Sequence, residues 1–246
     1  MSEGSGRKVI GIIGGMGPEA TADLYLKIIE ETGASCDQQH LDVVIVSDPT
    51  VADRTRAILG SGPDPAPQII RSATRCVRAG ADFLIMPCNA AHHFHPQVQG
   101  GVEVPVVHMI DEVVRHLREE HPEVRAVGIM AASGTVASGM YQRFLADAGI
   151  EALVPDEGDQ DLVMEGIYAV KSGQHRRAGQ LFPEVAERML SAGAGAIIAG
   201  CTEIPLGLRE LPSGILIDAT RVLARAAVRI ALGDREFPPG GRCVRN

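Results

Sequence analysis

The chain of 246 residues has no tryptophan, and its aromatic residues are limited to three Tyr and five Phe. Basic residues are also few: the chain has 23 Lys and Arg and 31 Asp and Glu, which gives a formal charge of −8. Proteins that bind nucleic acids neutralise phosphates with clustered Lys and Arg, and the sequence has no basic stripe with interleaved aromatic residues. The composition therefore argues against nucleic acid as a partner.

Long apolar runs and an even set of cysteines are also missing. No run of 18 apolar residues occurs, and the first eight residues have no apolar core of the kind found in signal peptides. The five cysteines form a low and odd count, which fits a reducing compartment better than a disulfide framework. We therefore expect a cytoplasmic protein without a membrane partner, in which a thiol is either catalytic or buried.

Two stretches of the sequence repeat one pattern at an offset of 113 residues. They are Ala79-Gly-Ala-Asp-Phe-Leu-Ile-Met-Pro-Cys88-Asn89 and Ala192-Gly-Ala-Gly-Ala-Ile-Ile-Ala-Gly-Cys201-Thr202. Each short apolar run predicts a buried parallel strand, and ligands of open α/β sheets gather beyond the carboxyl ends of such strands. Each thiol is therefore expected where a substrate would bind.

A second repeat indicates that the whole chain is duplicated. Residues 9–20 align with residues 126–137 at an offset of 117, and both read as a strand, a turn of small residues and a helix. Strands and helices alternate throughout, which predicts an α/β fold of parallel sheets covered by helices. We expect two similar domains, the first from 1–112 plus 213–246 and the second from 113–212, with the last strand and helix returning to the first half.

Further elements are expected from local signals. The predicted strands are 8–13, 41–46, 104–107 and 215–217, and the predicted helices are 18–32, 67–79, 110–120 and 219–231. Residues 48–67 carry many Gly and Pro residues and are expected to form a loop, either rigid or acting as a lid. The tail from residue 233 is expected to be loosely held.

Two opposed thiols suit inversion at a carbon acid. One group removes a proton from one face and the other returns a proton to the opposite face, while preorganised donors stabilise the carbanion. Thiolates are the reactive form, and we expect helix N-termini after Cys88 and Cys201 to favour them. Cys36, Cys76 and Cys243 lack this context and are expected to be structural or at the surface.

Several residues are candidates for holding a carboxylate substrate. Asn89 and Thr202 follow the thiols at equivalent positions, and backbone N–H groups in the turns at 14–17 and 133–135 could bind an anion. Arg54 lies after a predicted strand, and its planar guanidinium matches a carboxylate. Lys171 is expected at the end of a helix, where either a surface role or a site role is possible.

Two rival sites are weaker. Residues 15–20 satisfy G-x-G-x-x-A, the dinucleotide fingerprint, but paired thiols have no role in nicotinamide binding and the glycines also suit a tight turn. His92, His93 and His95 form an H-H-x-H pattern that is not a strong zinc signature. We expect no metal, and we expect His92 to be a pocket residue more readily than its two neighbours.

Several blocks together resemble the aspartate/glutamate racemase family, on its aspartate-racemase branch, in order over residues 8–220. The three signature blocks are Gly14-Gly-Met-Gly-Pro-Glu-Ala-Thr21, Pro87-Cys-Asn-Ala-Ala-His92 and Gly200-Cys-Thr-Glu-Ile-Pro205, and the supporting blocks are residues 53–55, 134–141 and 167–173. The resemblance implies two flavodoxin-like domains with the active site in the cleft between them. It also implies cofactor-independent racemisation in a homodimer.

The resemblance assigns roles to individual residues. Cys88 and Cys201 are the implied acid/base pair, and the implied substrate-binding residues are Met16, Arg54, Asn89, Ala90, Thr135, Lys171, Thr202 and Glu203. Many relatives have Thr where this chain has Ala90, so the preferred amino acid stays open. The sequence thus predicts an aspartate or glutamate racemase. The alternatives are a thiol-dependent isomerase or decarboxylase of a related dicarboxylate or modified amino acid, or a non-catalytic amino-acid-binding protein.

Overall fold

The computed structural model describes residues 6–208 and 214–237. Contacts between Cα atoms divide the chain into two compact units. Unit 1 comprises Met1–Asp53, Pro63–Met109 and Thr220–Asn246, and unit 2 comprises Arg54–Gly62 and Ile110–Ala219. Each unit has its own parallel sheet, as expected for a duplicated α/β chain.

Unit 1 is built on three parallel strands in the order β2-β1-β3. They are β1 (Ile10–Gly14), β2 (Val43–Ser47) and β3 (Phe83–Ile85). All residues of β1 and β3 are buried, which explains why their sequences are continuous apolar runs and do not alternate.

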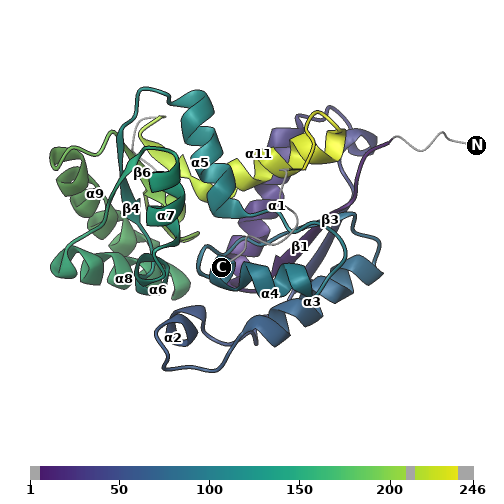
Figure 1. Ribbon diagram of the computed structural model, residues 1–246, viewed down its shortest axis with the longest axis horizontal. Helices are drawn as coiled ribbons and strands as arrows, with labels where there is room; N and C mark the ends of the chain where they lie inside the picture. Colours follow the sequence, from purple (N-terminus) through teal and green to yellow (C-terminus); the bar gives the residue numbers. More distant parts are fainter. Residues whose placement is uncertain (1–5, 209–213, 238–246) are drawn as a thin grey trace, which may run out of the picture. The chain divides into compact units, whose positions relative to one another are not determined.

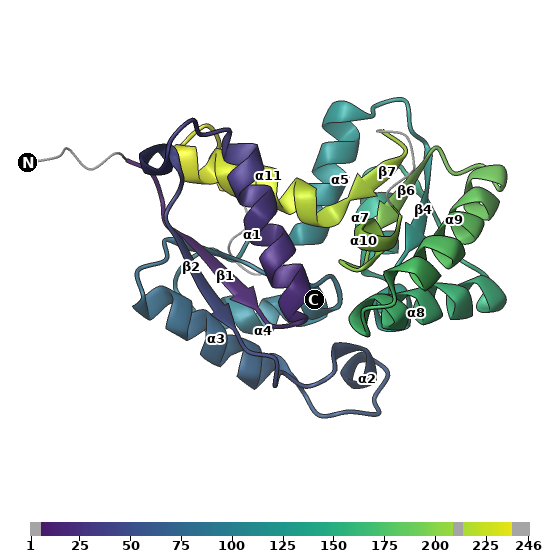
Figure 2. The same cartoon turned by 180° about the vertical axis from the view of Figure 1, so that it is seen from behind.

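Helices cover both faces of this sheet, with α1 and α11 on one side and α3 and α4 on the other (Figure 1, Figure 2). The helical segments are α1 (Pro18–Thr32), η1 (Asp37–Gln39), α3 (Ala66–Arg78), η2 (Ala90–Phe94), α4 (His95–Gly100) and α11 (Ala219–Leu232). The limits of α1 are those predicted, because Pro18 occupies the first turn and Gly33 ends the helix in the left-handed conformation with φ of 61°.

Unit 2 repeats the same strand order and adds a fourth strand, giving β5-β4-β6-β7. The strands are β4 (Ala126–Met130), β5 (Glu151–Leu153), β6 (Ala196–Ala199) and β7 (Leu216–Asp218). The corresponding pairs β1–β3 and β4–β6 are both parallel, so each predicted cysteine strand lies beside the first strand of its unit. The predicted α/β fold with two similar parallel sheets is confirmed.

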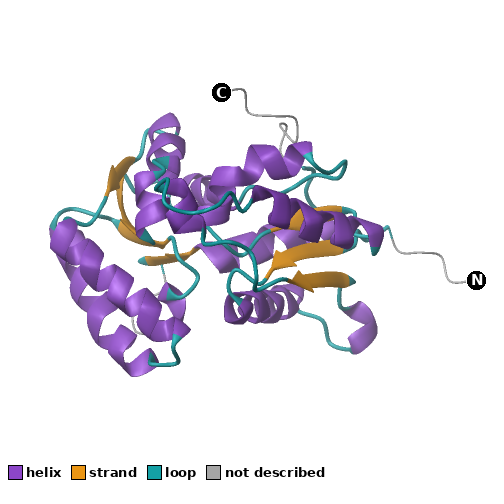
Figure 3. Cartoon of the chain, turned by 90° about the horizontal axis from the view of Figure 1, so that it is seen from below, coloured by secondary structure: helices purple, strands orange, loops and turns teal. Residues whose placement is uncertain are grey.

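Helices lie on both sides of the sheet of unit 2 (Figure 3). The helical segments of this unit are α2 (Arg54–Ile58), α5 (Met109–Glu120), α6 (Ser133–Ala137), α7 (Met140–Asp147), α8 (Glu157–Lys171), α9 (His175–Ser191) and α10 (Ile204–Gly207). Gly166 allows α8 to lie against α9, since a Cβ there would come within 2.3 Å of the Phe182 ring. Their apolar faces form the buried core of this unit together with residues of β6 and α10.

Two strand predictions need correction. The stretch predicted as a strand at 104–107 makes only a bridge from Val106 to Leu84, without an extended ladder. The strand predicted near 215–217 was expected to return to the first half, but β7 pairs with β6 of unit 2. The following helix, α11, does lie in unit 1 from Thr220 onward.

The sequence did not predict that residues 54–62 belong to unit 2. These residues were expected to form part of a loop, yet they contain α2, which packs beside α6. Gly134 explains the close approach, because a Cβ at this position would lie 2.7 Å from the Cα of Thr55. Arg54 therefore belongs to unit 2, although it comes from the first half of the sequence.

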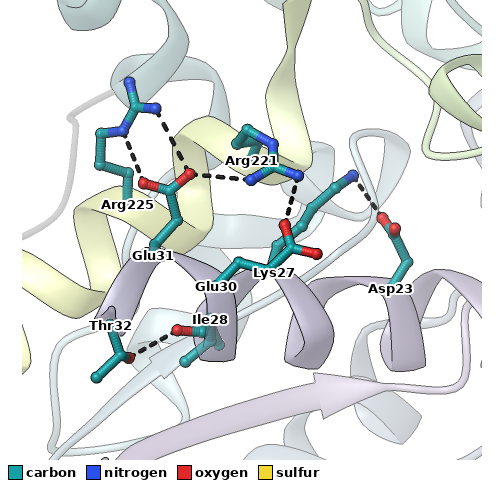
Figure 4. Close-up of polar contacts among 8 residues, drawn as sticks. All are labelled: Asp23, Lys27, Ile28, Glu30, Glu31, Thr32, Arg221 and Arg225. Carbon is teal, nitrogen blue, oxygen red and sulfur yellow. Dashed lines mark hydrogen bonds and ion pairs between the residues drawn. The ribbon is translucent and has the colours of Figure 1, made fainter. Parts of the chain in front are cut away.

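Ion pairs join the first and last helices of unit 1 (Figure 4). Arg221 contacts Glu30 at 2.8 Å and Glu31 at 3.1 Å, and Arg225 contacts Glu31 at 3.0 Å. Although partial burial opposes ionisation, the hydrogen bonds from both guanidinium groups lower the pKa of Glu31. These contacts help to hold α11 against α1 in unit 1.

Among the described residues, no helix combines the length and the apolar character that a membrane span needs. The described cysteines are all free thiols, with Cys36 exposed and Cys76 buried, and burial raises the pKa of Cys76 to about 11. Cys243 and residues 238–246 of the tail lie outside the described part of the chain.

Candidate active site

The first candidate thiol, Cys88, lies just beyond β3 in unit 1. Its residue is 8% exposed, its N–H donates to the Met86 carbonyl at 2.9 Å, and its carbonyl accepts from Ala91 N–H at 3.2 Å. The turn then enters η2, a 3-10 helix of five residues. The predicted position at the carboxyl end of a parallel strand is where the structure places Cys88, but the helix that follows is short.

His92 holds this turn through both of its ring nitrogens. The Met109 backbone N–H donates to Nε2 at 3.0 Å, so Nε2 is an acceptor and Nδ1 carries the hydrogen. Nδ1 then donates to the carbonyl of Cys88 at 2.9 Å. Burial, with a smaller contribution from His95, lowers the pKa of His92 to about 3, so this side chain is neutral.

His92 is therefore a structural residue of the core, because both of its ring nitrogens bond to backbone groups and neither is left for a ligand in the pocket expected for it. Its ring contacts those of His95 and His108, with centroids 6.1 Å and 4.9 Å away. Within residues 6–208 and 214–237, no group of His, Cys, Asp or Glu side chains is arranged to hold a metal ion.

Three further predicted residues belong to unit 1 and are buried: Met16, Asn89 and Ala90. Met16 lies in the turn between β1 and α1, where Gly15 has φ of 93° and a Cβ would come within 2.3 Å of the Asp48 backbone. The Gly15 N–H donates to Thr21 Oγ1 at 2.9 Å. This turn therefore needs its glycine for steric reasons, and one N–H group considered for anion binding is already used.

The second candidate thiol, Cys201, follows β6 in unit 2. Gly200 N–H donates to the Met130 carbonyl at 2.7 Å, which fixes the strand end against β4. A side chain at Gly200 would meet Ala131 at 2.9 Å and the Tyr141 ring at 3.2 Å, so only glycine fits before the thiol. Cys201 is partly exposed, and the helix after it, α10, has four residues.

An ionic group surrounds Cys201. Its thiol Sγ donates to Glu203 Oε2 at 2.9 Å, and the Thr202 hydroxyl donates to the same oxygen at 3.2 Å. Lys171, the last residue of α8, brings its Nζ to 3.0 Å from Glu203 Oε1. The structure thus brings four predicted residues together and gives Lys171 a carboxylate partner within the protein.

Thr135 and Arg54 come from neighbouring short helices of unit 2. Thr135 is 1% exposed, and among the described residues its Oγ1 has no hydrogen-bond partner. Two backbone N–H groups of the same turn are occupied, since Ser133 donates to the Met164 sulfur and Thr135 donates to the Ala132 carbonyl. These two N–H groups are therefore not available to a ligand, whereas the Thr135 hydroxyl is.

Sequence reasoning did not select Tyr141 as a site residue, although it lies in one of the blocks that carry the resemblance. Its side chain is fully buried, and its ring packs beside Gly200, next to the second thiol. Burial raises the pKa of the Tyr141 hydroxyl, and the neighbouring acidic groups Cys201 and Asp218 raise it further. The hydroxyl therefore stays protonated, close enough to both groups to feel their charge.

Comparisons with known proteins found similar sequences and similar folds. A family model described as Asp/Glu/Hydantoin racemase matches residues 13–227. The chain is 31% identical, over 89% of its length and 96% of the relative's, to the broad specificity amino-acid racemase RacX of Bacillus subtilis (strain 168). The aspartate racemase of Picrophilus torridus matches with a TM-score of 0.82 and 30% identity over 96% of this chain and 98% of its own. An aspartate racemase homologue from Pyrococcus horikoshii OT3 gives a TM-score of 0.73 and 25% identity over 91% of this chain and 99% of its own.

Proposed function

This chain belongs to the Asp/Glu/hydantoin racemase family and is an isomerase of the Asp/Glu racemase type, and from that premise we propose that it interconverts L- and D-aspartate, with glutamate as a poorer substrate. The single observation that supports the proposal most strongly is the matched placement of two thiols. Cys88 and Cys201 follow β3 and β6, which pair in the same way with the first strand of their units.

The proposed chemistry uses the two thiols on opposite faces of one substrate. One cysteine, as thiolate, takes the Cα proton, and the other, as thiol, donates a proton to the opposite face of the planar intermediate. The proposal therefore requires both half-sites to meet the same Cα. No cofactor is needed in this scheme, because a Schiff base would need one of three lysines and Lys171 is paired with Glu203.

The carbanion that forms is far less stable than a thiolate, so donors must stabilise the negative charge on the substrate carboxylate. Arg54 is proposed to bind a substrate carboxylate through its planar guanidinium. Thr135 supports the same role, since its buried Oγ1 has no partner among the described residues. We propose that Asn89 and Thr202 contact the substrate beside the thiols, and that Met16 and Ala90 line the site.

A wider substrate range is the second candidate, and two observations favour it. Ala90 has no hydroxyl to offer a substrate, and Lys171 is paired with a protein carboxylate, so neither side chain is available to recognise a substrate side-chain carboxylate in the free protein. A relative of similar length is named as a racemase of broad specificity. Neutral amino acids of similar size are therefore the second substrate class to test.

Incubation of the purified protein with single enantiomers tests the proposal. Each L- and D-amino acid is supplied separately, and the opposite enantiomer is measured by chiral chromatography while released carbon dioxide is trapped. We expect D-aspartate from L-aspartate and the reverse, without loss of carbon. Release of carbon dioxide would replace the racemase with a decarboxylase, and binding without turnover would replace it with an amino-acid-binding protein.

Two further properties complete the proposal. A two-thiol mechanism needs both cysteines reduced, and the described cysteines are all free, so we propose a reducing, cytoplasmic setting. We also propose a homodimer, because Tyr25 and Leu26 of α1 are 39% and 57% exposed and offer apolar surface that a second copy could cover. Light scattering after size-exclusion chromatography tests the dimer, and a mass of 26.0 kDa would contradict it.

A further inference from the structure

The carboxylate of Glu203 is buried and fully engaged beside one of the two thiols. The residue is 6% exposed, Oε2 accepts from Cys201 Sγ at 2.9 Å and from Thr202 Oγ1 at 3.2 Å, and Oε1 faces Lys171 Nζ at 3.0 Å. These contacts leave Glu203 poorly placed to bind a substrate directly. Its influence on the reaction must therefore pass through Cys201.

One proton is shared between Cys201 and Glu203, and intrinsic acidity places it on sulfur. A free thiol has a pKa of about 8.5 and a free carboxyl of about 4.3, so the carboxyl loses its proton first. The ammonium of Lys171 lies 3.0 Å from the other oxygen of the same carboxylate. A thiolate at Cys201 would lose this hydrogen bond and would place two negative charges 2.9 Å apart.

Two further titratable groups near Cys201 in the described part of the chain, Asp218 and Tyr141, do not reverse this preference. Asp218, the last residue of β7, pairs with Ala199 of β6 and adds a second carboxylate, which acts on Tyr141 as Cys201 does. Tyr141 is buried and neutral, and it contributes no positive charge. Lys171 supplies a positive charge to this group, and it lies at the oxygen of Glu203 that does not accept from Cys201.

The surroundings of Cys88 differ. Within unit 1, over its described residues, the Cys88 thiol makes no hydrogen bond to a carboxylate, and the histidine that holds its turn is neutral and bonded to backbone groups. A thiolate at Cys88 therefore meets no carboxylate hydrogen-bonded to it from its own unit. The two thiols are thus unequal before any substrate binds.

We propose that Glu203 is a positioning residue that keeps Cys201 protonated in the free protein, so that Cys201 begins turnover as the acid and Cys88 as the base. This inference rests on the proposed racemase function. In the forward turnover the Cα proton moves to the Cys88 thiolate, and the Cys201 thiol gives its proton to the opposite face. One proton has then been transferred from Cys201 to Cys88, and exchange of protons with solvent restores the resting form.

Alkylation of the free protein with iodoacetamide tests the inference without requiring racemase activity. The rate at Cys88 and at Cys201 is measured separately by mass spectrometry of their peptides, as a function of pH from 6 to 10. The midpoint of each profile reports the thiolate fraction, whereas the plateau at high pH reports access of the reagent. Comparing the midpoints, and not the rates, therefore keeps the difference in exposure between the two thiols out of the result.

We expect the midpoint for Cys201 to lie above that for Cys88 in the wild-type protein. Glu203→Gln should lower the Cys201 midpoint by at least about one pH unit, because an amide can donate to a thiolate, and it should leave Cys88 unchanged. Glu203→Asp keeps a carboxylate and should stay closer to wild type. The matched control is Glu165→Gln, which removes a half-exposed carboxylate of α8 that pairs with Arg177, and should change neither midpoint.

An unchanged or higher Cys201 midpoint in Glu203→Gln would overturn the inference, as would a wild-type Cys201 midpoint below that of Cys88. These outcomes are separate from the test of the proposed function. A protein that racemises no amino acid but shows the expected midpoints would refute the racemase and leave the role of Glu203 intact. Racemisation together with an unchanged Cys201 midpoint in Glu203→Gln would support the racemase and refute the role of Glu203.

Discussion

The turn after β3 and the turn after β6 have the same place in their sheets but different polar surroundings. In unit 1 the Cys88 carbonyl is held by a neutral, buried His92, whereas in unit 2 the Cys201 thiol is held by the ionised pair of Glu203 and Lys171. The matching sheets therefore give the two thiols equivalent positions, while the neighbouring side chains give them different charge environments. The comparison teaches that two thiols at matching positions of similar sheets need not be equally acidic.

The largest expected effect comes from removing either thiol. Cys88→Ser and Cys201→Ser should each lower kcat by about 10³-fold or more, because a poorly acidic hydroxyl cannot replace a positioned thiol in proton transfer. Chiral chromatography of the product measures the rates, and Cys36→Ser, at an exposed cysteine, is the control. Near-normal turnover in either site variant would mean that the two turns do not share one reaction.

A smaller effect is the pH dependence of the free energy of unfolding, to which the buried histidine of the Cys88 turn contributes. The folded protein holds the pKa of His92 at about 3 and the unfolded chain returns it to about 6.5, so the unfolded chain binds more protons between these values. The contribution of His92 to stability is therefore present above about pH 6.5 and is lost as pH falls toward 3. Between pH 7 and pH 5 the loss is about 2 kcal/mol for this group.

Urea unfolding at both pH values measures this loss. His92→Gln should remove about 2 kcal/mol of the pH dependence, whereas His93→Gln, at an exposed position of the same helix, should retain it. Equal pH dependence in the His92 variant and the wild type would show that this histidine is not the neutral anchor of the Cys88 turn.

Thr135 offers a prediction in which stability and activity change in opposite directions. Thr135→Val keeps the shape but removes a buried hydroxyl that has no partner among the described residues, so the free protein should gain up to about 1 kcal/mol of stability. The same variant should lower kcat/KM by about tenfold if the hydroxyl binds substrate. Urea unfolding and racemisation assays on one preparation measure both, and unchanged kcat/KM would remove Thr135 from the site.

The smallest expected effect lies at the junction of α1 and α11. Arg225→Gln should reduce the free energy of unfolding by about 0.5 kcal/mol at neutral pH, because exposed ion pairs contribute little. The lowered pKa of Glu31 means that its contribution is present above about pH 4.5 and is lost as pH falls below that value. A loss of several kcal/mol at neutral pH would show that the ion pairs between α1 and α11 stabilise unit 1 more than their solvent exposure suggests.

Much of the fold could be predicted because strong local signals mark it. Pro18 and Gly33 define the ends of α1, and the buried apolar runs before Cys88 and Cys201 define β3 and β6. The short helix α2 could not be predicted, since five residues among Gly and Pro carry little signal. Its position depends on packing against Gly134, some 80 residues further along the chain.

The contacts among the candidate site residues could not be predicted from the sequence. Sequence patterns and resemblance selected Lys171 and Glu203 separately, but their ion pair joins the end of α8 to the turn after β6 and exists only in the folded unit. His92 was expected in a pocket because it follows Cys88 by four residues. That spacing instead brings its ring to the Cys88 carbonyl, which is a structural contact.

Racemisation of a single enantiomer in deuterated water, stopped at early times, tests the central claim most directly. If two thiols act on opposite faces, the newly formed enantiomer should carry deuterium at Cα while the remaining substrate keeps its hydrogen. Deuterium entering the remaining substrate as fast as the product forms would show that a single base serves both faces, and the account of paired thiols would be contradicted.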